Sequence, residues 1–166
     1  DNTVTYLPVD SLLDETGTGL ANGVTQQDID DALAFVNTIT PGALQDELLT
    51  KVESAQKMMN AKKEAEGLLN SSQDDLANGI DQGDITNAGT IVGNLVDGPF
   101  KDVLQSLVEK AQTILDAITS VNDLDNDGKS DLVVDATQDM IDTAQKAVDK
   151  LDPTTDRAKE LQKLID

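Results

Sequence analysis

The chain of 166 residues carries a formal net charge of −20, which disfavours binding to nucleic acid and to anionic lipid. It contains no Cys and no His, so disulfides, thiolate or imidazole metal sites and His-based catalysis are excluded. No apolar run approaches the roughly 18 residues of a membrane span, and with one Tyr and two Phe the cores must be built from aliphatic side chains.

The first residues predict an extended segment. Val4 and Tyr6 alternate with polar residues before Pro8, which is typical of a strand that ends at a proline. We therefore expect residues 1–13 to form a short extended leader, and such a segment would suit the last strand of a preceding β domain.

Beyond the leader the sequence repeats with a period of 56 residues. Leu20-Ala-Asn-Gly23 returns as Leu76-Ala-Asn-Gly79, and a second shift of 56 places Ile85 on Ile141. One extra residue after Leu151 then restores the register, which places Leu104 on Leu161. The predicted boundaries are 14–69 for the first repeat, 70–121 for the second, 122–135 for a linker and 136–166 for a truncated third repeat.

Each repeat is expected to be a helical hairpin. Gly and Pro mark turns at 40–42, 96–99 and 152–154, and apolar residues before and after them recur at spacings of three and four. Thr25 and Asp81 each precede an acidic residue by three positions, as helix N-caps do. The predicted fold class is all-α: tandem hairpins of about 56 residues forming an elongated helical array after the short extended leader.

Four carboxylates lie within the nine residues from Asp123 to Asp131, at positions 1, 3, 5 and 9. They would repel one another unless a cation lay among them, and Ca²⁺ accepts six to eight oxygen ligands in a flexible geometry. The predicted ligands are the side chains of Asp123, Asp125, Asp127 and Asp131 and the backbone carbonyl of Lys129. We call residues 123–131 the acidic loop.

The acidic loop differs from an EF-hand. Gly128 supplies the sharp turn at position 6, but position 12 is Val134 where an EF-hand has a bidentate Glu. The alternative interpretation is a solvated acidic turn that joins two helices without a metal.

The pattern Asp-x-Asp-x-Asp-Gly-x-x-Asp resembles the calcium loops of thrombospondin type 3 and FG-GAP repeats, and this resemblance implies Asp135 as an outer ligand. The hairpins resemble helical repeat modules of bacterial surface adhesins and biofilm-associated proteins. Comparable hairpins occur in the C-terminal halves of pesticidal crystal protoxins. These resemblances imply a helical architecture and calcium binding rather than an activity.

The segments 14–24 and 70–80 are equivalent to the linker by register. The second retains only Asp75 of the acidic pattern and is predicted to bind no metal, whereas the first, with Asp14 and Glu15, would bind weakly at most. In both segments Leu-Ala-Asn-Gly is predicted to add one helical turn closed by a left-handed glycine.

These features favour a calcium-stabilised spacer of a bacterial surface adhesin, outside the cell, where calcium is plentiful. Its expected partners are the calcium ion, neighbouring domains of a longer surface protein and, in a second hypothesis, a host protein. Phe35, Leu49 and Ile91 are candidates for such a contact, although their spacing equally suits core packing. Neither nucleic-acid binding nor membrane insertion is expected.

An enzyme is the third class, and adjacent carboxylates are its only candidates. Asp30 with Asp31 and Asp74 with Asp75 lie in polar surroundings, and neighbouring residues point apart on a helix. Acid–base catalysis needs a carboxyl group in a desolvated pocket. We therefore expect no enzymatic activity.

Overall fold

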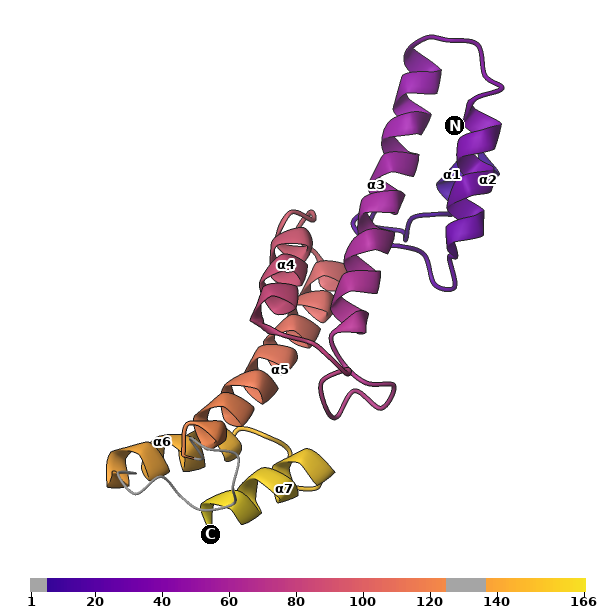
Figure 1. Ribbon diagram of the computed structural model, residues 1–166. Helices are drawn as coiled ribbons and strands as arrows, with labels where there is room; N and C mark the ends of the chain where they lie inside the picture. The colour runs from indigo at the N-terminus through magenta and orange to yellow at the C-terminus, as the bar shows by residue number, and fades with distance from the viewer. Residues whose placement is uncertain (1–5, 125–136) are drawn as a thin grey trace. The chain divides into compact units, whose positions relative to one another are not determined.

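The computed structural model of the chain describes residues 6–124 and 137–166. Over these residues the chain is all-α, as predicted, and Figure 1 shows its seven helices. Their bounds are α1 Leu7–Asp10, α2 Gln26–Val36, α3 Ala43–Gly67, α4 Gln82–Gly93, α5 Pro99–Asn122, α6 Gln138–Val148 and α7 Asp156–Ile165.

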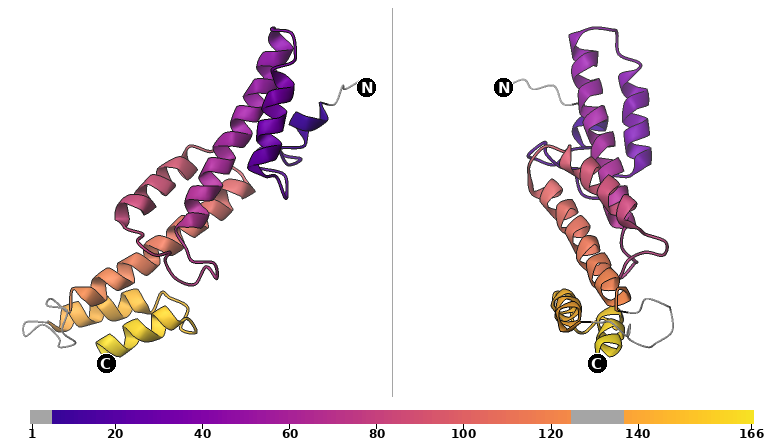
Figure 2. Two further views of the ribbon diagram at one scale, coloured as in Figure 1. Left: turned by 45° about the vertical axis from the view of Figure 1, so that its right-hand side comes forward. Right: turned by 60° about the vertical axis from the view of Figure 1, so that its left-hand side comes forward.

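The chain divides into two compact units. The N-terminal unit runs to Ala65 and includes Ala88–Gln105, and the C-terminal unit comprises Glu66–Asn87 and Ser106–Asp166. Figures 1 and 2 show α2 beside α3 in the N-terminal unit and α6 beside α7 in the C-terminal unit. No helix of the described part of the chain is both long and apolar enough to cross a membrane.

The extended leader predicted for residues 1–13 is wrong for residues 7–10, which form α1; residues 1–5 lie outside the described part. Pro8 is compatible with a helix here because it occupies the first turn, where an amide N–H has no intrahelical partner. Val9 and Leu12 lie three residues apart and are buried in the core of the N-terminal unit. Burial of this apolar pair therefore outweighs the alternating pattern before it.

Asp10 ties α1 to the long helix α3. One of its carboxylate oxygens accepts a hydrogen bond from the Tyr6 N–H at 2.8 Å, and the other lies 3.0 Å from the Lys51 ammonium. Burial opposes ionisation of Asp10, but the hydrogen bonds from Lys51 and Tyr6 outweigh it and lower the pKa of Asp10.

The predicted N-caps are confirmed. The Thr25 hydroxyl accepts from the Asp28 N–H at 3.3 Å while the Asp28 carboxylate accepts from the Thr25 N–H at 2.7 Å, which is a capping box. Asp81 and Asp84 make the same reciprocal pair at the start of α4, at 3.1 and 3.0 Å.

Reciprocal glutamine hydrogen bonds join the two helices of each hairpin. In each pair both side-chain amides donate and accept, at 2.6–3.0 Å. The pairs are Gln26 with Gln56, Gln82 with Gln112, and Gln145 with Gln162. Each pair satisfies its own polar groups, so it fixes the axial position of one helix against the other.

The cores are aliphatic and contain many alanines. Both units have a buried cluster in which Ala side chains are fully enclosed, which brings the helix backbones close together. The N-terminal cluster is Val9, Leu12, Ile29, Ala32, Val36, Leu48, Val52, Ala55 and Met59. The C-terminal cluster is Ala117, Val121, Leu124, Ala144, Val148 and Leu161.

Replacing Ala32 by Leu should overpack the N-terminal core, because Ala32 has no exposed surface. We expect a loss of about 1–3 kcal/mol in the free energy of unfolding, measured by urea denaturation. Ala34, two residues away on α2, is exposed, so Ala34→Leu should change stability by no more than about 0.5 kcal/mol. Equal denaturation midpoints for the two variants would contradict this view of the core.

The Asp10 contact should make stability depend on pH. Because the pKa of Asp10 is lowered in the folded chain, its contribution is complete above the ordinary value of 3.8 and is lost as the pH falls through the lowered value. Between pH 5 and pH 3, Asp10→Asn should therefore lose less stability than the wild type, by at most about 1 kcal/mol. Thermal melts in which the wild type and Asp10→Asn lose stability in parallel over this range would contradict this role of Asp10.

Candidate functional site

Most of the predicted calcium ligands lie outside the described residues. These are Asp125, Asp127, Lys129 and Asp131, together with the outer ligand Asp135. Asp123, the first position of the acidic loop, is described and exposed. The calcium site therefore stays a prediction, and the structure supplies the surroundings of its first ligand.

Asp123 directly follows the last residue of α5. Its N–H donates to the Thr119 carbonyl at 2.9 Å, which continues the helical pattern by one residue. The next residue, Leu124, is 1% exposed and belongs to the C-terminal core cluster. Because Leu124, the second residue of the acidic loop, is buried in the core, Asp123 before it is held at the surface.

A shallow pocket of about 220 Å³ adjoins Asp123. It is lined by Ser120, Asp123, Asp139, Met140 and Thr143, so it brings a carboxylate from the end of α5 together with one from the first turn of α6. Asp139 was not among the residues predicted from the sequence. The feature that could have indicated it is its position two residues after Thr137, the N-cap of α6, whose hydroxyl accepts a hydrogen bond from the Met140 N–H.

The members of each carboxylate pair considered for catalysis have separate hydrogen-bond partners. Asp30 and Asp31 are exposed, and each accepts a hydrogen bond from the glutamine four residues earlier in α2. Asp74 accepts from Asn70, and Asp75 accepts from Arg157. Among the described residues, no three acidic side chains gather closely enough to hold a metal ion.

The candidate contacts for a host protein are partly buried. Phe35 and Leu49 pack against the N-terminal core cluster, and Ile91 is half-buried on α4. Phe35 and Leu49 therefore take part in core packing, which was the alternative to a host-protein contact in the sequence analysis.

The first loop, residues 14–20, is closed by backbone hydrogen bonds rather than by a helix. The Asp14 N–H donates to the Gly19 carbonyl at 2.9 Å, and Leu13 pairs with Leu20 in an isolated antiparallel bridge. The predicted extra helical turn in Leu-Ala-Asn-Gly is therefore wrong. Its left-handed glycine is confirmed, because Gly23 has a φ of +82°.

The second loop, residues 70–76, has the same backbone pattern at residue numbers 56 higher. The Asn70 N–H donates to the Asp75 carbonyl at 2.9 Å, and Leu69 pairs with Leu76. Gln73 has a φ of +56° where the first loop has Gly17 at +70°. The turn geometry is thus kept even where a non-glycine residue must adopt the left-handed conformation.

Polar side chains stabilise both loops from within. In the first loop the Asp14 carboxylate accepts from the hydroxyl and the N–H of Thr16 at 2.6 and 3.0 Å, and the Thr16 hydroxyl lowers the pKa of Asp14. In the second loop the Asn70 side chain accepts from the Asp74 N–H at 3.1 Å and donates to the Asp74 carboxylate at 2.7 Å. Both loops therefore contain hydrogen bonds between their own side chains and backbone.

Each of these loops also contacts the hairpin of the next repeat, at the turn between its two helices: α4 and α5 for the first loop, α6 and α7 for the second. In the N-terminal unit, a Cβ atom placed on Gly19 would lie only 2.7 Å from the Phe100 Cβ, so the loop backbone lies directly against the start of α5. The same closeness is seen from the turn before α5, where a Cβ placed on Gly98 would lie 2.5 Å from the hydroxyl oxygen of Thr18 in the loop. We call the Gly19–Phe100 contact the first junction.

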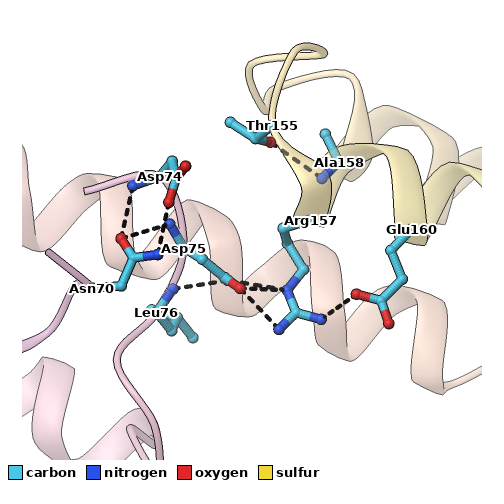
Figure 3. Close-up of polar contacts among 8 residues, drawn as sticks. All are labelled: Asn70, Asp74, Asp75, Leu76, Thr155, Arg157, Ala158 and Glu160. Carbon is cyan, nitrogen blue, oxygen red and sulfur yellow. Dashed lines mark hydrogen bonds and ion pairs between the residues drawn. The ribbon is translucent and has the colours of Figure 1, made fainter. Parts of the chain in front are cut away.

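In the C-terminal unit the second loop meets the start of α7 through an ion pair, shown in Figure 3. The Arg157 Nε lies 3.0 Å from Asp75 Oδ1, and Nη2 lies 3.0 Å from Oδ2. We call this contact the second junction. By the repeat register, with its extra residue after Leu151, Asp75 corresponds to Gly19 and Arg157 to Phe100.

Gly19→Ala should strain the first loop and the first junction together, because its Cβ would lie 2.5 Å from Asp14 Oδ2 and 2.7 Å from the Phe100 Cβ. We expect a loss of about 1–3 kcal/mol in unfolding free energy, measured by urea denaturation. The control is Gly67→Ala at the end of α3, where an added Cβ would meet nothing within 4 Å. It should be neutral or stabilise by up to about 1 kcal/mol, and an unchanged Gly19→Ala variant would show that the loop does not pack this closely.

Comparison with known proteins identifies a helical family. The family model described as pesticidal crystal protein Cry1Aa, domain IV, matches residues 8–61 and again residues 56–117. No curated protein and no solved structure matches the chain. The matches agree with the resemblance of the hairpins to those of crystal protoxins, while the resemblance to adhesin modules stays a prediction. Because the two matches together span more than half of the sequence, the chain belongs to the family of pesticidal crystal protein Cry1Aa, domain IV.

Proposed function

We propose that the chain is a non-catalytic helical spacer in which a calcium ion, bound by the acidic loop, orders the connection between α5 and α6. The observation that carries the proposal is the difference between equivalent loops. The first and second loops are closed by their own side chains, whereas the acidic loop places carboxylates at alternate positions.

The internal hydrogen bonds of the two described loops supply partners that the proposed ion would supply in the acidic loop. Asp14 and Asn70 occupy the same position in the repeat, and each binds backbone N–H groups of its own loop. In the acidic loop, Asp125 and Asp127 flank the equivalent residue, Asn126. Their charges would repel each other and Asp123, and a divalent cation is the simplest way to bring them together.

The surroundings of the acidic loop support an ordering role. Before it, Leu124 is anchored in the C-terminal core, and after it, Thr137 caps the start of α6. These contacts involve only residues of the chain at or beyond the two ends of the loop, and calcium would act on the segment between them. The proposed ligands are Asp123, Asp125, Asp127 and Asp131 through side chains and Lys129 through its carbonyl. Bound there, the ion would neutralise charge and order the connection, without a role in catalysis.

The proposed setting is outside the cell, at a bacterial surface, as one module of a longer protein involved in adhesion. The family model describes a numbered domain of a larger crystal protein, which supports the role of one module among several. Extracellular calcium modules bind with dissociation constants of about 10⁻⁴–10⁻³ M. Calcium at roughly ten times the dissociation constant would stabilise the folded chain by about 1.4 kcal/mol.

The test is a pair of thermal melts, one in excess calcium and one in a chelator. The wild type should melt about 3–6 °C higher in calcium, as a gain of about 1.4 kcal/mol implies for a chain of this size. Asp125→Ala with Asp127→Ala should abolish that difference because it removes two central ligands.

The matched control is Asp30→Ala with Asp31→Ala, which changes the net charge equally at exposed positions of α2. It should retain the full calcium response. A wild type that melts at the same temperature in calcium and in chelator would contradict the proposal, as would a control that loses the response together with the loop variant.

A further inference from the structure

The two junctions make the same contact with different chemistry. At the first, the Gly19 backbone lies against Phe100 and beside the Asp14 carboxylate of its own loop, and among the described residues no ion pair joins the loop to the start of α5. At the second, the equivalent positions are Asp75 and Arg157, which form a two-pronged ion pair. A contact between a loop and a helix start can thus be held either by close apolar packing or by charge.

Arg157 is the only arginine in the chain. Its planar guanidinium matches both oxygens of a carboxylate, which a lysine ammonium cannot do. The side chains of Arg157 and Asp75 are 30% and 25% exposed, so water and salt reach the pair. Its third nitrogen, Nη1, binds Glu160 within α7 at 2.8 Å, so Arg157 keeps a local partner when it leaves Asp75.

Each side of the second junction also has hydrogen bonds of its own. The second loop is closed by the hydrogen bonds of Asn70 with Asp74 and of the Asn70 N–H with the Asp75 carbonyl. The start of α7 is capped by Thr155, whose hydroxyl accepts from the Ala158 N–H at 3.2 Å. The loop and the helix can therefore separate as intact pieces, without unfolding of either.

We infer that the Asp75–Arg157 pair is an electrostatic latch, which holds the second loop on the start of α7 at low ionic strength and releases it at high ionic strength. A partly exposed pair weakens as the screening length falls from about 10 Å at 0.1 M salt to about 3 Å at 1 M. The first junction contains no ion pair and stays closed over the same range. The latch is independent of calcium and of the function proposed above.

The lone arginine provides a direct probe, because its Nε–H gives a single side-chain signal in a nitrogen–proton NMR spectrum. In 5 mM calcium and low salt, exchange of this proton with water should be slow, since Nε donates to Asp75. In 1 M NaCl the exchange should accelerate by about tenfold or more, as expected for loss of a hydrogen bond to a charged group. Asp75→Asn should exchange fast at both salt concentrations.

Glu160→Gln is the matched control. It changes the charge equally and removes the other partner of Arg157, yet Nε exchange should stay slow at low salt because Asp75 remains. Fast exchange in the wild type at low salt would overturn the latch. So would exchange that is indifferent to salt, or a signal that depends on Glu160 but not on Asp75.

A double variant tests the equivalence of the junctions. Asp75→Gly with Arg157→Phe installs the residues of the first junction at the second. Backbone amide shifts of residues 70–76 should then be independent of salt, whereas in the wild type they should move over the range in which Nε exchange accelerates. Salt-dependent shifts of the same size in the double variant would contradict the latch, and unchanged circular dichroism would show that both proteins are folded.

Discussion

The connections between the helices depend on how a tight loop satisfies its polar groups. A loop of this kind brings several amides and side-chain oxygens into a small volume, and each of them needs a partner. Asp14 provides the partners in the first loop and Asn70 in the second, from the same position of the repeat. The acidic loop instead concentrates negative charge in a chain whose net charge is already −20. In the function proposed above, a bound cation balances this charge, and the alternation of the carboxylates suits that role.

The helices supply a rigid frame for these loops. Because the cores are built from Ala, Val, Ile, Leu and Met, the helix backbones come close together, and the glutamine pairs fix their axial positions. Buried residues next to the loops, such as Leu12 and Leu124, extend this frame to the loop ends. Loop sequences can then vary in chemistry while their ends stay in place. The two junctions follow the same principle, since Gly19 with Phe100 and Asp75 with Arg157 make one contact in two ways.

Sequence reasoning predicted the helices, their turns and their caps, because these depend on local spacing and on residues three positions apart. It failed where a distant partner decides the local structure. Residues 7–10 are helical because Val9 is buried, and Leu20 pairs with Leu13 although no strand pattern surrounds either residue. The Asp75–Arg157 pair joins residues 82 positions apart, so no local pattern indicated it. The acidic loop was predicted from spacing alone, whereas the proximity of Asp139 to Asp123 becomes visible only once α5 and α6 are placed.

The central claim is that the acidic loop binds a divalent ion, and a crystal structure determined in 10 mM calcium tests it most directly. Anomalous scattering should show one ion, with oxygen ligands at about 2.3–2.6 Å. These ligands should come from the side chains of Asp123, Asp125, Asp127 and Asp131 and from the Lys129 carbonyl. An ordered acidic loop with its carboxylates directed into solvent and no ion among them would contradict the account.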